Sequence, residues 1–261
     1  MISWNDHDWD IFSSVVAGAA EGGLDALPMG ELMAVIGKSF VGSAYVPGTL
    51  EADGPERLVI NFRAFDCVTF VETVHALSVV LKNGAAERLD DRASVETEYE
   101  QVVQALRYRN GFLNGYESRL HYFSEWIYDN DRRRLITDIS RDLNGVLDRE
   151  VINFQSTNPG AYRQLSDPRV LEDIESIERR LSQRGRFFVP QDRIADVVDR
   201  IENGDIIAVT STLEGLDVAH TGLALWVDGE LHLLHAPLVG ESVEISERPL
   251  ASRVQAIDSQ D

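Results

Sequence analysis

The residue pattern of this 261-residue chain changes at Gly204, and this change limits the fold to one class. The spacing of apolar residues or the composition predicts helices over residues 7–20, 28–40, 94–109 and 167–184. After Gly204, short runs rich in β-forming residues follow at 205–212, 220–227, 230–236 and 242–246. Helices that precede antiparallel strands predict an α+β fold.

Asp228 and Gly229 separate the second and third of these strand runs. A two-residue Asp-Gly linker between strands is among the strongest short-range signals of a β-hairpin. The turn predicts that Val227 pairs with Glu230, so that the numbers of paired residues sum to 457. The sequence therefore predicts both a hairpin and its register.

The charge of the chain limits its partners. Asp and Glu number 44 against 24 Lys and Arg, for a formal net charge of −20, so nucleic acid is repelled and is excluded as a partner.

No run approaches the ~18 apolar residues of a membrane span. Residues 1–10 also lack the basic and apolar regions of a signal peptide. We expect no membrane span, and a cytoplasmic protein as the chain is written, or a periplasmic or secreted one if a leader has been removed.

Cys67 is the only cysteine, so an intramolecular disulfide and an all-cysteine zinc site are excluded. Asp66 is suited to cap a helix that begins at Cys67, because Val71 and Val74 follow at helical intervals. A thiol at a helix N-terminus faces free N–H groups and the positive end of the dipole. Its pKa is then expected to fall from about 8.5 toward neutrality. The alternative is a buried structural cysteine.

Three of the six histidines fall within sixteen residues, on the two strands of the predicted hairpin. The predicted register places His220 diagonal to His235, so one imidazole can contact the other. His232 lies three residues from His235 and therefore faces the opposite side of the strand. We interpret His232, like His7 and His75, as structural. A helix-tip thiol, an imidazole and a second polar group form the arrangement that a cysteine hydrolase needs.

The order of several sequence blocks resembles one family. GSAYVPGTL precedes FDCVTFVE, followed by NGDIIAVTS, HTGLALWVDGELHLLHA and VEIS. This order is similar to the NlpC superfamily of papain-like cysteine hydrolases, which cut bacterial cell-wall peptides. The segment YRNGFLNGYESRLHYFSEWIYDN resembles its N-acetylmuramoyl-L-alanine amidase-like branch, long catalogued as a domain of unknown function.

The resemblance implies a papain-like NlpC-type fold, in which the nucleophile helix packs on an antiparallel sheet. We expect a single domain over residues 1–261. The nucleophile helix region would span 37–81, a large helical insertion or cover 86–202, and the sheet with both histidines 203–250.

The resemblance also implies roles for individual residues. Cys67 would be the nucleophile, His220 the general base and His235 the polar residue that orients it. Asp66 and Tyr45 occupy positions that shape the substrate site in the superfamily.

Val68 replaces the serine whose hydroxyl helps many relatives hold a free amino end. We therefore expect the substrate to be a muropeptide cleaved at the N-acetylmuramoyl-L-alanine bond. A γ-D-glutamyl-L-diamino acid endopeptidase of the same fold is the alternative.

Segment 111–130 carries further candidates. A helix is expected to begin at Ser118, with Phe123 and Trp126 on its core face. Near its start, a guanidinium and hydrogen-bonding rings are suited to a sugar acid or a peptide carboxylate. These candidates for the cleft are Tyr116, Arg119 and His121.

Two other hypotheses remain open. One is a zinc amidase with Cys67, His220 and a second histidine as ligands, although the chain has no HExxH motif. The other is a catalytically idle module that binds peptidoglycan fragments. The cysteine-hydrolase interpretation requires no cofactor and no metal.

Overall fold

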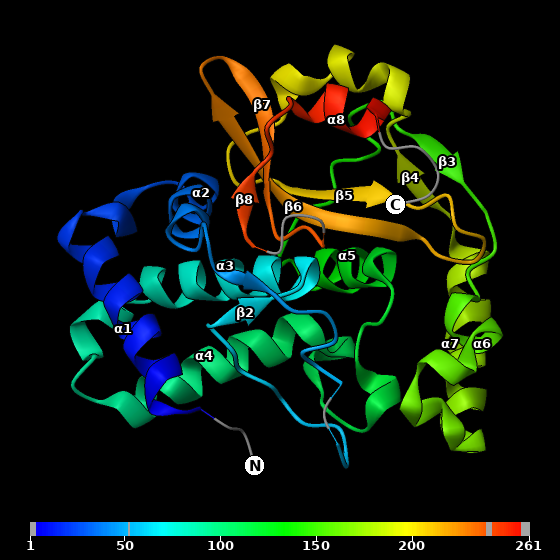
Figure 1. Cartoon of the computed structure of the whole chain (residues 1–261), viewed down its shortest axis with the longest axis horizontal. Helices are drawn as coiled ribbons and strands as arrows, with labels where there is room; N and C mark the ends of the chain where they lie inside the picture. The colour runs from blue at the N-terminus through cyan, green and yellow to red at the C-terminus, as the bar shows by residue number, and fades with distance from the viewer. Residues whose placement is uncertain (1–3, 52, 239–241, 257–261) are drawn as a thin grey trace.

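The computed structural model describes residues 4–51, 53–238 and 242–256, and it combines helices with small sheets, as an α+β chain should (Figure 1). The helices of the first half are α1 (Asp6–Glu21), α2 (Met29–Ser39), α3 (Cys67–Lys82), α4 (Arg92–Arg107) and α5 (Phe123–Arg132). Those of the second half are α6 (Phe154–Thr157), α7 (Pro168–Arg184) and α8 (Leu250–Ala256). The main sheet consists of β5 (Ile206–Thr210), β6 (Val218–Val227), β7 (Glu230–His235) and β8 (Glu244–Ile245).

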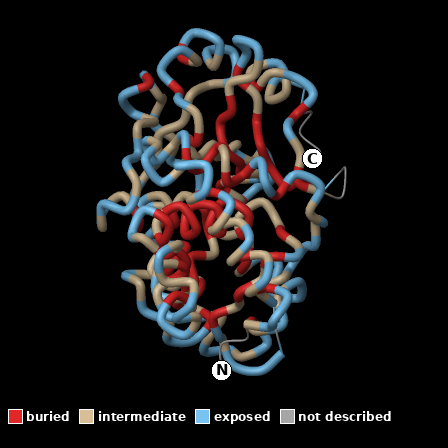
Figure 2. The backbone as a smooth tube through the Cα atoms, turned by 90° about the vertical axis from the view of Figure 1, so that its left-hand side faces the viewer, coloured by how far each residue is buried: buried red, intermediate tan, exposed pale blue. Residues whose placement is uncertain are grey.

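Helix α3 is the centre of the main core. Helices α1, α2 and α4 contact it, and β6 and β7 pack against it from the sheet. Its buried positions lie on nearly every side, from Phe70 to Leu81, which is the pattern of a helix enclosed by other elements. Figure 2 shows this buried layer in red beside the buried strands of the sheet. The surroundings of α3 therefore fix the position of its first residue, Cys67.

The hairpin of β6 and β7 has the predicted register. Val227 pairs with Glu230, and the pairing continues to Leu223 with Leu234. Asp228 and Gly229 both have positive φ, 50° and 85°, as a type I′ turn requires. The prediction of a tight antiparallel hairpin is confirmed.

Both faces of the β6–β7 hairpin are buried. On one face, Leu223 and Leu234 join the core around α3. On the other face, Ala224 and Leu233 join a separate cluster with Leu250 of α8. Strand alternation thus assigns each residue of the hairpin to the α3 face or to the α8 face.

Residues 86–202, which were expected to form a helical insertion or cover, also contain strands. Helix α4 lies in the same core as α3, whereas α7 belongs to a second cluster with Ile152 and Leu165. Strands β3 (Val146–Asp148) and β4 (Arg186–Phe188) form an antiparallel pair that the helical pattern did not predict. Strands β1 (Ala44–Tyr45) and β2 (Ala64–Phe65) pair in parallel, which the sequence analysis did not predict either. Such short strands depend on a distant partner, which local sequence does not reveal.

The helix expected at Ser118 does not begin there. Residues Tyr116–Ser118 form one short 3₁₀ turn, and α5 begins at Phe123. The Ser118 hydroxyl donates to the carbonyl of Gly115 and accepts from the N–H of Asn114, so it closes a turn instead of capping a helix. The assignment of Phe123 and Trp126 to the core is confirmed. Their rings are stacked with centroids 4.8 Å apart.

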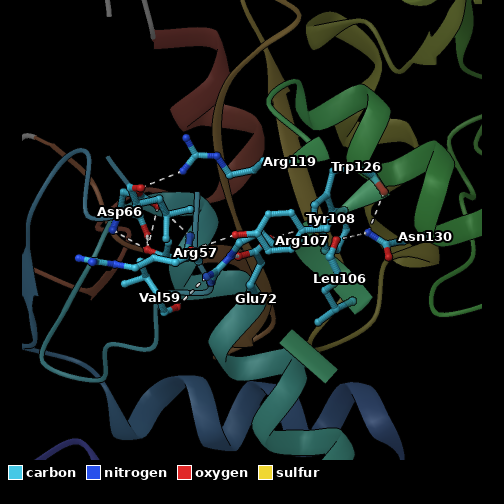
Figure 3. A network of polar contacts seen from close by, with 12 residues as sticks. Arg57, Val59, Asp66, Glu72, Leu106, Arg107, Tyr108, Arg119, Trp126 and Asn130 are labelled. Carbon is cyan, nitrogen blue, oxygen red and sulfur yellow. Dashed lines mark hydrogen bonds and ion pairs between the residues drawn. The ribbon is translucent and has the colours of Figure 1, made fainter. Parts of the chain in front are cut away.

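A buried polar network joins α3, α4 and α5 (Figure 3). The Arg107 guanidinium donates to the Glu72 carboxylate at 2.7 Å, and Trp126 Nε1 donates to the same carboxylate at 3.2 Å. Removing one partner of a buried ion pair leaves the other charge uncompensated, at a cost of about 3–5 kcal/mol. The network therefore holds the three helices in one arrangement behind the site.

Candidate active site at the start of helix α3

Cys67 is the first residue of α3, as predicted. The Asp66 side chain accepts from the N–H of Thr69 at 2.8 Å, and the Thr69 hydroxyl accepts from the N–H of Asp66 at 2.9 Å. These reciprocal bonds form a capping box, which fixes where the helix begins. The thiol is therefore held at a helix N-terminus.

The expected lowering of the thiol pKa is not found. Burial raises the pKa of the Cys67 thiol, and the nearby Asp66 carboxylate raises it further. The Thr221 backbone and side chain and the N–H of Cys67 itself lower it, but they do not outweigh the burial. The sequence prediction considered the helix terminus alone, whereas desolvation and the capping carboxylate oppose the thiolate.

Thr221 connects the thiol to the sheet, and the sequence analysis did not single it out. This residue of β6 lies on the α3 face and interacts with the thiol of Cys67. Its hydroxyl oxygen is buried and, apart from this interaction with the thiol, has no hydrogen-bond partner within the described part of the chain. Because Thr221 is next to His220, Cys67 lies at the same end of β6 as that histidine, but the side chains of these two neighbours point to opposite faces of the strand.

The two histidines of the hairpin meet as predicted. His220 Nε2 and His235 Nδ1 are 2.7 Å apart, and the ring planes are inclined at 82°. Burial, followed by the positive charge of Arg253, lowers the pKa of His220 to about 4. Burial is also the main cause that lowers the pKa of His235 to about 3. Both imidazoles are therefore neutral at pH 7.

His232 lies apart from this pair. Its Nδ1 is 2.8 Å from the carbonyl oxygen of Ser246, and it pairs across the hairpin with Leu225 on the α3 face. Within the described residues, no hydrogen bond joins Cys67 to His220, which bonds to His235 instead. The structure thus brings the two histidines together on the α8 face of the hairpin, because His220 and His235 alternate with Thr221 and Leu234 of the α3 face. The thiol interacts with Thr221 on the α3 face, at the same end of β6.

Tyr45 and Asp66 lie around the thiol. Burial raises the pKa of the Tyr45 phenol, and the charges of Cys67 and Asp66 raise it further. This mutual effect places the three side chains in one neighbourhood. Both residues that the family resemblance assigned to the substrate site are therefore beside Cys67.

Tyr116, Arg119 and His121 contact one another. The Arg119 guanidinium makes an ion pair with Glu51, lies 3.6 Å from Glu56, and stacks over the Tyr116 ring at 4.9 Å. His121 Nε2 is 2.8 Å from the Tyr116 carbonyl oxygen. Because Arg119 already pairs with carboxylates of the protein, its guanidinium is not available to bind a substrate carboxylate in this structure.

Two further residues position the histidine-bearing strand. The buried Asp217 carboxylate accepts from the N–H of Ser124 at 2.7 Å and from the N–H of Val218 at 2.8 Å, which ties the start of β6 to the first turn of α5. Gly222 lies opposite His235, and a Cβ there would be 2.9 Å from the Cβ of His235. The glycine within the run HTG was the sequence signal for this close approach.

The described residues contain no cluster of three or more His, Cys, Asp or Glu side chains that could hold a metal ion. Among the same residues, no helix has the length and apolarity needed to cross a membrane.

Comparisons with known proteins identify the family of this chain. The family described as N-acetylmuramoyl-L-alanine amidase-like matches residues 35–259. This chain belongs to that family. The match includes the capped cysteine and both histidines of the hairpin.

Solved structures share this fold. An N-acetylmuramoyl-L-alanine amidase from Bacteroides uniformis is 34% identical with a TM-score of 0.80, over 88% of this chain and 94% of that one. A proposed xylanase from Bacteroides fragilis is also 34% identical, with a TM-score of 0.79, over 85% and 95% of the two chains. A Legionella pneumophila protein shares the fold at 19% identity and a TM-score of 0.63, over 94% and 89%. No curated protein matches the sequence.

Membership in the amidase-like family supports a hydrolase with a cell-wall amidase-like role and a peptidoglycan-derived substrate.

Proposed function

We propose that this amidase-like protein is a cysteine hydrolase with an NlpC-type, papain-like site, which cleaves the N-acetylmuramoyl-L-alanine bond of muropeptides. The observation that carries the proposal is the joint position of Cys67, at the capped start of α3, and the bonded pair of His220 and His235 at the adjoining end of β6. A nucleophile, a base and a group that orients the base are the parts required for acyl transfer.

The resting site holds a neutral thiol and a neutral imidazole, because burial opposes both charged forms. In the first step, His220 Nδ1 takes the thiol proton while the sulfur of Cys67 attacks the carbonyl carbon of the lactyl amide. No hydrogen bond joins these two groups within the described residues, so this step requires the thiol and the His220 ring to approach each other at the end of β6 when substrate binds. The backbone N–H of Cys67 has no acceptor within its own helix and can face the oxyanion.

The tetrahedral intermediate then collapses. The C–N bond breaks, His220 returns its proton to the departing amine, and the peptide leaves with a free L-Ala amino group. The sugar acid remains as a thioester on Cys67. His220 next takes a proton from water, the hydroxide attacks the thioester, and the sulfur leaves and recovers the proton.

The environment of Val68 favours cleavage of the N-acetylmuramoyl-L-alanine bond over cleavage of the bond that a γ-D-glutamyl-L-diamino acid endopeptidase cuts. Val68 packs against the main core and offers no hydroxyl to a free L-Ala amine. A substrate whose L-Ala nitrogen is already acylated by the sugar needs no such partner. Tyr45 and Asp66 remain beside the thiol to contact the substrate.

Mass spectrometry of a defined muropeptide, N-acetylmuramic acid with an attached peptide, tests the proposal. We expect free sugar and intact peptide. A cut after D-Glu, which leaves L-Ala and D-Glu together, would support the endopeptidase, and no cleavage would support a binding module. Loss of activity on chelation, with recovery on addition of zinc, would support the zinc amidase.

Matched variants assign the residues. Cys67→Ala should abolish turnover, and His220→Ala should lower it by about 10²-fold or more. His235→Ala should also impair turnover, with His235→Asn retaining more because an amide can still bond to His220. His232→Ala is the control on the other face of the same strand and should stay near wild type. If His232→Ala were the damaging change, the assignment of the pair would be wrong.

A further inference from the structure

The two ring nitrogens of His235 have different surroundings. Nδ1 is 2.7 Å from His220 Nε2, whereas Nε2 is buried and has no hydrogen bond in the described part of the chain. Strand β8 pairs Glu244 with His235, and its carboxylate oxygen lies 3.7 Å from His235 Nε2. The His235 side chain is 0% exposed, while that of Glu244 is 40% exposed. A carboxylate at the edge of the sheet thus faces the unpartnered ring nitrogen of His235.

The protons of the histidine pair allow two arrangements. Both rings are neutral at pH 7, so only one of the two facing nitrogens carries a hydrogen. If His235 has its hydrogen on Nε2, then His220 Nε2 donates to His235 Nδ1. His220 Nδ1 then keeps a lone pair and can accept a proton. If His235 donates through Nδ1, His220 has its hydrogen on Nδ1 and cannot act as a base there.

We propose that Glu244 is a positioning residue, which holds His235 in the tautomer with the hydrogen on Nε2 and so keeps His220 Nδ1 free to accept the thiol proton. An N–H at Nε2 is attracted to the carboxylate, whereas a lone pair at Nε2 would face its negative charge. The proposal rests on the proposed role of His220 as the base. It adds a residue that touches neither the thiol nor the substrate.

The charges around His235 come from three elements. His220 lies on β6, Arg253 on α8 and Glu244 on β8. Arg253 opposes a positive charge on the pair. Glu244 places a carboxylate oxygen 3.7 Å from His235 Nε2. When His220 becomes an imidazolium, the carboxylate therefore also stabilises the charge through His235.

Alkylation of Cys67 by iodoacetamide tests the proposal without any cell-wall substrate, so a failed amidase assay does not affect it. Below the thiol pKa, the thiolate arises by proton transfer to His220. We expect Glu244→Ala to slow alkylation at pH 7 on the order of tenfold. Well above the thiol pKa, hydroxide forms the thiolate directly, and the rates of variant and wild type should converge. A purely structural defect would slow the reaction at every pH.

Two variants complete the experiment. Glu244→Gln keeps an oxygen acceptor without the charge and should fall between wild type and Glu244→Ala. Glu247→Gln makes the same charge change at an exposed position three residues along the chain and should match wild type. Equal rates for Glu244→Ala and Glu247→Gln at pH 7 would overturn the proposal. So would a slowing by Glu244→Ala that persists at high pH.

Discussion

At the scale of single residues, Asp66 has two opposing effects on the site. Its side chain caps α3 through the N–H of Thr69 and so places Cys67. The same carboxylate raises the pKa of the thiol that it positions. Helix geometry and thiol acidity therefore depend on one side chain, and a substitution can separate them.

Asp66→Asn should retain the cap, since asparagine is as good an N-cap as aspartate. Without the negative charge, the pKa of Cys67 should fall. The pH midpoint of iodoacetamide alkylation measures this shift. Asp91→Asn is the control, because Asp91 caps α4 in the same way. A midpoint that stays in place or rises in Asp66→Asn would contradict the assigned effect of the carboxylate.

At the scale of elements, the β6–β7 hairpin determines whether the two histidines can meet. Its I′ turn fixes the register, and the register places Gly222 opposite His235. The absence of a side chain at Gly222 leaves the space that the His235 Cβ occupies. Packing on one face of the hairpin thus controls the geometry of the pair.

Gly222→Ala should destabilise the fold and displace His235. The added Cβ would lie 2.8 Å from Leu233 Cδ1 and 2.9 Å from His235 Cβ, an overpacking that costs about 1–3 kcal/mol. Denaturant unfolding measures the stability, and muropeptide turnover, which should fall, reports the histidine pair. Gly18→Ala on α1 is the control, because its Cβ meets nothing within 4 Å and should stabilise the helix by up to about 1 kcal/mol. Wild-type turnover in Gly222→Ala would show that the close approach is not needed.

At the scale of the whole molecule, buried neutral histidines make stability depend on pH. Burial alone lowers the pKa of His75, in the middle of α3, to about 4. The unfolded chain therefore binds a proton at this residue below pH 6.5, while the folded chain does not. The contribution of His75 to stability is complete above about pH 6.5 and is lost as the pH falls toward 4.

His75→Leu should remove this loss. Relative to wild type, the free energy of unfolding of the variant should rise by about 1.4 kcal/mol per pH unit as the pH falls from 6 to 4.5. Urea unfolding across this range measures the difference, and titrating groups common to both proteins cancel. His7→Leu, at an exposed residue of α1, is the control and should show no such slope. Parallel pH curves for His75→Leu and wild type would show that His75 is not the source.

The sequence by itself determined the features that depend on neighbours in the chain. The cap at Asp66, the start of α3 at Cys67, the I′ turn and the meeting of His220 with His235 all follow from short-range geometry. Strand pairing extends that local geometry in steps of two residues, which is why the diagonal contact could be predicted.

Only the tertiary structure decided what depends on burial and on distant partners. It raised the pKa of Cys67 instead of lowering it, because desolvation comes from elements packed around the helix tip. It brought Thr221 to the thiol and Glu244 to His235, and it occupied Arg119 with Glu51 from a remote loop. No spacing in the chain encodes these contacts, because the residues meet only after the chain has folded.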